Sequence, residues 1–187
     1  AKAQEQGYTG ARWPKMVGPE GIESPSTIAP LLIWQQPHPL MYAESCYREK
    51  PTLETLKKFE EIVFETAEFM ASFAVFDEER GRYVLGPPVI PAQECHPPES
   101  TTNPTFELAY WRYGLQIAGI WRKRLGLDPE AKWNDVMENL AELPSKDGVY
   151  LAHENCPETF TEKNHDHPSM LGALGSLPGD GVDHDVM

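Results

Sequence analysis

The chain lacks a hydrophobic run long enough to cross a membrane, and it lacks the charge of a nucleic-acid-binding protein. Its 187 residues contain no apolar stretch of about 18 residues, so we predict no transmembrane helix and no membrane partner. The formal net charge is −13, whereas phosphate binding needs a basic face. We therefore exclude nucleic acid as a partner.

Cysteine is scarce, and its spacing favours neither disulfides nor a metal site. The three cysteines are Cys46, Cys95 and Cys156. They show no paired spacing and no metal signature, so we expect reduced or buried thiols and leave the compartment open. His165, Asp166 and His167 could be read as metal ligands, but no further ligand with suitable spacing is obvious. The sequence therefore predicts no metal and no cofactor.

What the chain does contain is helical periodicity. Apolar residues recur at three- and four-residue steps from Leu53 to Phe73, after an N-cap at Thr52. A second helix is expected to start near Asn103 or Pro104 and to stop at Gly126. A third is expected to begin at Asp128, and Pro144 ends it. The tryptophans at helical spacings within these stretches, which we place in the core, are Trp111, Trp121 and Trp133.

Shorter elements fill the gaps between these helices. A helix should start near Pro39, and a short one should lie between Pro168 and Leu177. Gly81 to Gly86 is typical of a short strand or extended loop. Helices joined by proline-rich connections favour a single all-α domain over residues 1–187, either a toroid or a bundle.

One proline-bounded loop places a carboxylate and an imidazole directly before a helix. It reads Pro91-Ala92-Gln93-Glu94-Cys95-His96 and is followed by Thr102-Asn103-Pro104-Thr105-Phe106. This segment resembles the general-acid loop of the six-hairpin glycosidases, in particular the kojibiose and maltose phosphorylase family (glycoside hydrolase family 65) and its hydrolase relatives. The resemblance implies an (α/α)6 toroid in which Glu94 is the general acid.

Further segments are similar to that family in the same order along the chain. They are Gly7 to Pro14, Gly21 to Pro25, Ile62 to Ser72, Gly148 to His153 and Asp166 to Met170. A complete ring of six helical hairpins needs roughly twice this length, judging by helices of about 11–20 residues plus loops. The resemblance therefore predicts that this chain is a fragment of the catalytic barrel.

The chain also departs from the family's pattern. Lys15 and Met16 follow Pro14, where the family has a tryptophan and then an acidic or polar residue. Asp166-His167 stands where the family has a lysine-glutamine pair that contacts the sugar. These departures indicate a specificity different from the glucose of the phosphorylases.

The candidate site residues follow from the resemblance and from the polar and aromatic cluster beside the prolines at 37 and 39. A general acid must hold its proton near neutral pH, so Glu94 is expected in an apolar, partly desolvated pocket walled by aromatic residues such as Trp13, Trp34 or Tyr110. Asp166 is the candidate second carboxylate, although the base could lie outside the chain. The candidate substrate-binding residues are Arg12, Trp13, Glu23, Trp34, Gln35, His38, His96 and His167.

Each of these residues also has a structural interpretation. Trp34 and its neighbours could be a core tryptophan and a capped loop rather than a platform on which a sugar stacks. His96 could be bonded to loop backbone instead of to substrate. Cys95 is disfavoured as a nucleophile because no Cys-His-Asp arrangement is specified.

The predicted function is an inverting glycoside hydrolase that acts on an oligosaccharide or glycoside, with Glu94 protonating the departing oxygen. The missing lysine-glutamine pair and the absence of a phosphate-cradling glycine loop favour hydrolysis over phosphorolysis. Three alternatives stay open: a disaccharide phosphorylase, a non-catalytic carbohydrate-binding protein, and a helical interaction module. For the last, exposed apolar edges would be covered by an oligomer or by the remainder of the barrel.

Overall fold

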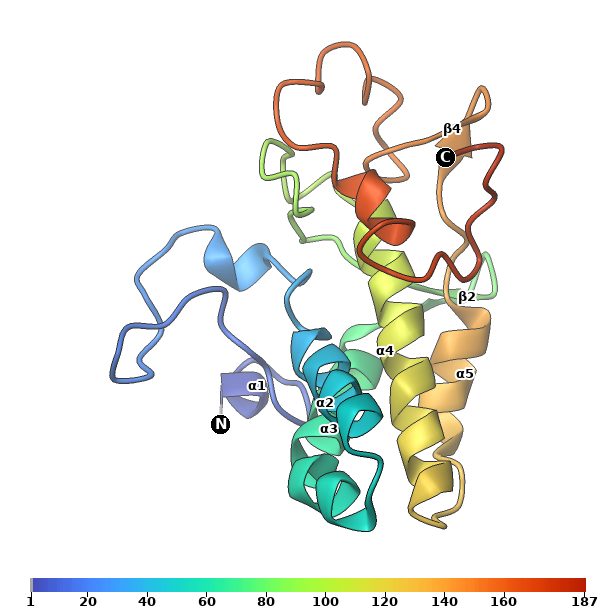
Figure 1. The fold of residues 1–187 in the computed structure, drawn as a ribbon. Helices are drawn as coiled ribbons and strands as arrows, with labels where there is room; N and C mark the ends of the chain where they lie inside the picture. Colours follow the sequence, from blue (N-terminus) through green and yellow to red (C-terminus); the bar gives the residue numbers. More distant parts are fainter. Residues whose placement is uncertain (1) are drawn as a thin grey trace.

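The computed structural model describes residues 2–187 and centres on four helices. They are α2 (His38–Glu49), α3 (Leu53–Phe73), α4 (Thr105–Arg124) and α5 (Ala131–Asn139). α3 and α4 form the centre, and each contacts both flanking helices, α2 and α5. Successive helices run in opposite directions, with the short turns between α2 and α3 and between α4 and α5 at the same end (Figure 1). This arrangement is an antiparallel bundle.

Two small hairpins and several short turns complete the chain. β1 (Val75–Asp77) pairs antiparallel with β2 (Arg82–Val84), and β3 (Ser145–Lys146) pairs antiparallel with β4 (Val149–Tyr150). The remaining elements are α1 (Lys2–Glu5) and the 3-10 helices η1 (Ala29–Leu31) and η2 (Ser169–Ala173).

The expectation of an all-α (α/α)6 toroid is wrong. Helices hold 39% of the residues and strands 9%, so the chain is a mixed α/β protein, and nothing in residues 2–187 indicates a ring of helical hairpins. The second hairpin is the clearest element that the helical interpretation missed. Its turn residues Asp147 and Gly148 both have positive φ, 53° and 80°, as a two-residue turn between antiparallel strands requires.

The predicted helices are largely confirmed, but α5 differs at both ends, since it stops at Asn139 and not at Pro144. Thr52 caps α3, since its side chain accepts a hydrogen bond from the Thr55 N–H. α5 begins at Ala131 rather than at Asp128. Arg122 Nε donates to the carbonyl of Asp128 at 2.6 Å, and this contact holds Asp128 in the connection between α4 and α5. The segment from Pro168 to Leu177 contains only the 3-10 helix η2.

The core lies between the four helices, and it includes one buried ionic cluster. Trp111, Trp121 and Trp133 are all buried, as predicted. The Trp121 indole donates to the carboxylate of Glu44 at 2.8 Å, and Arg124 also donates to that carboxylate. Because Glu44 is only 2% exposed, these donors are what make its charge tolerable in the core.

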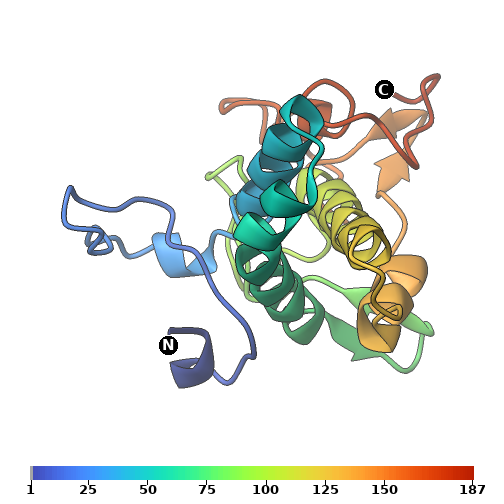
Figure 2. The ribbon, with the colours of Figure 1, turned by 60° about the horizontal axis from the view of Figure 1, so that its bottom comes forward.

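The long connections gather at the end of the bundle where α2 and α4 begin. The segments 85–104 and 151–187 lie there together with the start of α2 (Figure 1). The N-terminal segment runs along α3, with the Ala11 N–H donating to Glu65 O at 2.9 Å, and a loop beyond it projects from the bundle in both views (Figures 1 and 2). Across residues 2–187, we find no helix with the length and apolar character needed to span a bilayer.

Candidate functional site

A cavity of about 600 Å³ lies at the loop-covered end of the bundle, and this volume is typical of small-molecule sites. It is bounded by the first turns of α2 and α4, by the loop that carries Glu94, and by the segment from His167 to Leu177. Six of its lining residues carry aromatic, imidazole or carboxylate groups: Trp34, His38, Glu94, Phe106, Tyr110 and His167. We call this the central cavity.

One wall of the central cavity is aromatic and internally bonded. His38, the first residue of α2, shares a 2.8 Å hydrogen bond between its Nδ1 and the hydroxyl of Tyr110. Trp34 meets the His38 ring edge-on at 5.2 Å, and Phe106 stacks on Tyr110 with centroids 5.5 Å apart. Burial lowers the pKa of His38 and raises that of Tyr110, so both side chains are neutral at pH 7.

Glu94 also lines the central cavity, with its side chain 30% exposed and paired with Lys15. It is the only carboxylate among the described residues that line the central cavity. The Lys15 ammonium donates a charge-assisted hydrogen bond to it. A general acid must carry its own proton, so proton donation from Glu94 requires that a substrate first displace Lys15.

Asp166 does not line the central cavity but holds His167, which does. Asp166 Oδ1 lies 2.8 Å from Nδ1 of His167, and Nε2 of the same ring lies 2.6 Å from the carbonyl oxygen of Ala92. Both nitrogens of the ring therefore have an acceptor, which fixes its orientation beside the Glu94 loop. Asp166 is placed as a positioning residue for His167.

The carboxyl that meets the burial expected of a general acid is Glu107, which the sequence did not single out as a site residue. Glu107 lies in the first turn of α4, is 0% exposed and accepts a 2.6 Å hydrogen bond from the Ala92 N–H. Burial raises its pKa to about 7. Its other oxygen has no hydrogen-bond partner among the described residues. The signal in the sequence that could have indicated Glu107 was its position directly before Leu108, on the face of α4 that packs against the core.

Three of the predicted sugar-binding residues line a separate small cavity of about 110 Å³. Arg12 donates to Gln6 Oε1 at 2.6 Å and to the carbonyl of Pro30. Glu23 pairs with a lysine near the N-terminus. Trp13 is tied to α3, since its Nε1 donates to Thr66 Oγ1 at 2.9 Å. These contacts fasten the N-terminal segment, and the three residues are not among those that line the central cavity.

The last two predicted residues, Gln35 and His96, are buried and line neither cavity. Gln35 donates to the carbonyls of Leu32 and Trp13 at 3.2 and 3.3 Å. His96 packs edge-on against His153, with ring centroids 4.9 Å apart. The structure therefore brings Trp34, His38, Glu94 and His167 together at the central cavity, with Asp166 against His167, and the remaining candidates do not line it.

Comparison with known proteins adds no family assignment. No family model matches the chain, and no curated protein matches its sequence. The resemblance to the six-hairpin glycosidases therefore depends on the quoted sequence segments alone, and function must be argued from the central cavity.

Proposed function

We propose that the central cavity binds a carbohydrate and that the protein cleaves a glycosidic bond there, with Glu94 as general acid. The observation that carries this proposal is that four residues selected from the sequence, Trp34, His38, Glu94 and His167, line one cavity of about 600 Å³. If these side chains lay in the core or at unconnected places on the surface, they would not line a common cavity.

The chemistry of the lining suits a sugar. Pyranose rings present apolar C–H faces and polar hydroxyl edges, so their sites combine aromatic surfaces with hydrogen-bonding groups. Trp34, Phe106 and Tyr110 supply the aromatic surfaces, and His38 and His167 supply imidazoles. The Trp34 indole N–H is buried without a hydrogen-bond partner among residues 2–187. Because Trp34 lines the central cavity, this N–H is a donor that no described residue uses.

Hydrolysis by inversion also needs a carboxylate on the far side of the sugar to activate water. Asp166 is our candidate because it contacts His167, which lines the central cavity. Phosphorolysis would need no such base, because phosphate attacks directly. The two reactions therefore differ in one measurable requirement, added phosphate.

The test is turnover of a panel of α- and β-linked disaccharides, with and without phosphate, by the chain and by Glu94→Gln. We expect release of free sugar without phosphate and a fall in kcat of about 10²–10⁴-fold in the variant, the usual contribution of a general acid. Glu99→Gln is the matched control, because Glu99 lies on the same loop but is exposed. Equal turnover by Glu94→Gln and the chain would show that Glu94 is not the acid.

A second candidate function is sugar binding without catalysis. It is favoured by the pairing of Glu94 with Lys15, which leaves the single carboxylate of the central cavity already neutralised by a partner. Calorimetric sugar binding with no turnover, weakened by Trp34→Ala but not by Glu94→Gln, would support this function and exclude the hydrolase. Strict dependence of turnover on phosphate would instead identify a phosphorylase.

A further inference from the structure

Beside the central cavity, three residues with metal-binding side chains converge in the protein interior. One potential ligand atom from each of His96, His153 and Cys156 lies within 4.8 Å of the other two. The three residues are 4%, 2% and 3% exposed. We propose that this cluster binds a divalent metal ion of the zinc class, which fastens the Glu94 loop to the segment from His153 to Cys156.

The most direct support is His96. Both of its ring nitrogens are buried, and neither has a hydrogen-bond partner among residues 2–187. Buried imidazoles otherwise bond to backbone, side chains or water, because an unpaired buried polar group is costly. A metal ion at His96 would satisfy one nitrogen directly.

The donor set suits zinc. Two imidazoles and one thiolate are borderline-to-soft ligands, and zinc is regularly held by three protein ligands with a fourth position left for water. In a tetrahedral site, bonds of about 2.0–2.3 Å put the ligand atoms roughly 3.3–3.8 Å apart. The observed limit of 4.8 Å therefore needs only a small contraction, within the reach of side-chain rotation.

The protonation states also suit metal binding. Burial lowers the pKa of His96, and it lowers that of His153 to about 4, so both rings are neutral at pH 7. Burial raises the pKa of the Cys156 thiol, so a bound metal would displace its proton, which leaves to solvent. The positive charge of Lys163 lowers the pKa of His96 and would repel a bound cation. The negative charge of Asp166 raises that pKa and would attract a cation.

His153 has one weak competing bond. Its Nδ1 accepts from the backbone N–H of Asn155 at 3.2 Å, near the long end of the range for such bonds. A neutral imidazole has a single lone pair. A metal ion bound at Nδ1 of His153 would therefore replace this hydrogen bond. A metal ion bound at Nε2 would require the ring proton to move to Nδ1, which also breaks the hydrogen bond.

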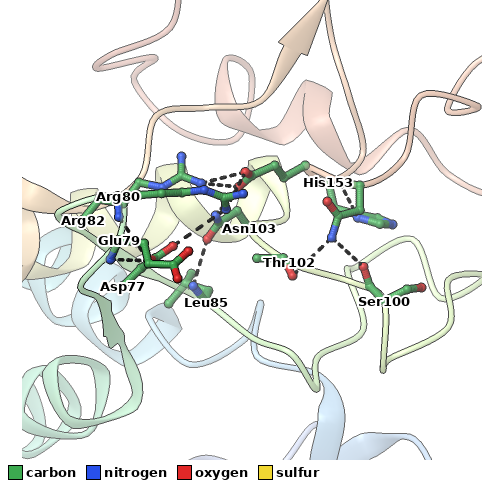
Figure 3. Close-up of polar contacts among 11 residues, drawn as sticks. Asp77, Glu79, Arg80, Arg82, Leu85, Ser100, Thr102, Asn103 and His153 are labelled. Atoms are coloured by element: carbon green, nitrogen blue, oxygen red, sulfur yellow. Dashed lines mark hydrogen bonds and ion pairs between the residues drawn. The ribbon is translucent and has the colours of Figure 1, made fainter.

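The two segments that supply the ligands are already held in register by a polar network (Figure 3). Glu154 accepts from Arg82 at 2.6 and 2.9 Å and from Asn103 Nδ2 at 2.5 Å. Asn155 Nδ2 donates to the Ser100 carbonyl at 3.1 Å. Because this network fixes Glu154 and Asn155, the two residues between His153 and Cys156, independently of any metal, it holds these two ligands in place before the ion binds.

The proposed ion would act on the central cavity through the backbone. His96 lies two positions after Glu94, and the segment beyond Cys156 leads to His167. Fixing His96 to Cys156 therefore limits how far the two loops that carry these cavity residues can separate. This role does not depend on which reaction the central cavity performs.

The first experiment is a titration of the full chain after treatment with a chelator. One equivalent of Co²⁺ should give the thiolate-to-cobalt charge-transfer band and the visible bands of a tetrahedral ion, and Zn²⁺ should abolish them. Free Zn²⁺ at about 100 times its Kd should raise Tm by roughly 5–10 °C. Binding of less than one equivalent, with no change in Tm, would overturn the proposal.

Variants locate the site. Cys156→Ser should remove the charge-transfer band, and His96→Gln should weaken Zn²⁺ binding by more than the roughly 10–100-fold that loss of a supporting residue costs. Cys46→Ser and His165→Gln are matched controls, since both residues are exposed. They should bind as the chain does.

Circular dichroism of each variant separates loss of a ligand from loss of the fold. If Cys156→Ser is unfolded, His96→Gln and the Tm shift of the unaltered chain still decide. One-equivalent binding that survives both ligand substitutions, or that is lost in His165→Gln instead, would show that the metal binds elsewhere and would overturn the proposal.

Discussion

Two glutamates on helices that contact each other, Glu44 on α2 and Glu107 on α4, are almost equally hidden from solvent but differ in their partners. Burial alone would raise the pKa of Glu44, but hydrogen bonds from Arg124, Arg48 and Trp121 outweigh it and hold the pKa below its ordinary value. Glu107 has one backbone N–H as its described partner and an unpaired oxygen. The donors at Glu44 therefore favour its charged form, whereas burial with a single backbone donor favours the protonated form of Glu107.

This difference makes stability depend on pH through Glu107. Its pKa rises from an ordinary 4.5 to about 7 on folding, so between these values the folded chain binds more protons than the unfolded chain. The contribution of Glu107 to stability therefore falls by about 3 kcal/mol as pH rises through this window, whereas the lowered pKa values of His38, His96 and His153 give contributions of the opposite sign. Glu107→Gln cannot lose this proton, so the difference in stability between the chain and Glu107→Gln should change by about 3 kcal/mol across the window. Urea unfolding at intervals from pH 4.5 to 8 measures it.

The control for Glu107→Gln is the same substitution at a glutamate that is not buried. Glu99→Gln removes the same charge from an exposed position on the preceding loop, and it should leave the pH dependence of unfolding nearly unchanged. Parallel curves for the chain and Glu107→Gln would show that Glu107 is not protonated in the folded state at pH 5–6.

At the scale of the elements, the ends of the helices follow local chemistry closely. α3 begins where Thr52 adopts an extended backbone and accepts the Thr55 N–H at 3.2 Å. This hydrogen bond satisfies one of the backbone donors that the first turn of a helix leaves free. The cap is therefore a local feature whose contribution can be measured in isolation.

Thr52→Ala should lower the free energy of unfolding by about 1 kcal/mol, because it removes the capping oxygen and leaves the backbone able to form the helix. Thr52→Ser keeps the hydroxyl and should retain most of the stability. Urea unfolding of the three proteins at one pH tests this. A loss as large in Thr52→Ser as in Thr52→Ala would mean that the methyl group, not the cap, is what matters.

At the scale of the whole molecule, the N-terminal segment joins the bundle through a close approach at Gly10. Gly10 has a φ of +69°, and a Cβ there would collide with the backbone of α3 at Glu65 and Phe69. The next residue donates its N–H to Glu65 O. Only glycine permits this close packing of the N-terminal segment on α3. Three residues later, the side chain of Trp13 is also bonded to α3.

Gly10→Ala should therefore destabilise the protein by more than Gly7→Ala does. Gly7 also has a positive φ, +85°, but nothing lies within 4 Å of its would-be Cβ, so its substitution costs only the backbone strain, about 1 kcal/mol. We expect a further loss of roughly 1–3 kcal/mol at Gly10 from the collision. Thermal unfolding of both variants, with hydrogen exchange over residues 2–13, tests this. Equal losses would refute the close packing of Gly10 on α3.

Part of the candidate site could be predicted from the sequence, because it depends on types of residue beside prolines. Trp34 and His38 were selected from the cluster beside the prolines, Glu94 and His167 were selected from the family resemblance, and all four line one cavity. Arg12, Trp13 and Glu23 were selected with them but lie at a different cavity. Nothing in the spacing of those residues reveals that their polar atoms bond to Gln6, Pro30 and Thr66 instead.

The sequence by itself determined the four main helices, the cap of α3 at Thr52 and the burial of Trp111, Trp121 and Trp133, because each depends on side chains within a few positions along the chain. Only the tertiary structure decided that the bundle is open, that Glu107 has one unpaired oxygen, and that His96 meets His153 and Cys156. Those outcomes require contacts between segments far apart in the chain, and local periodicity has no means of specifying them. Features that depend on neighbouring residues can therefore be predicted from the sequence, whereas contacts between distant segments cannot.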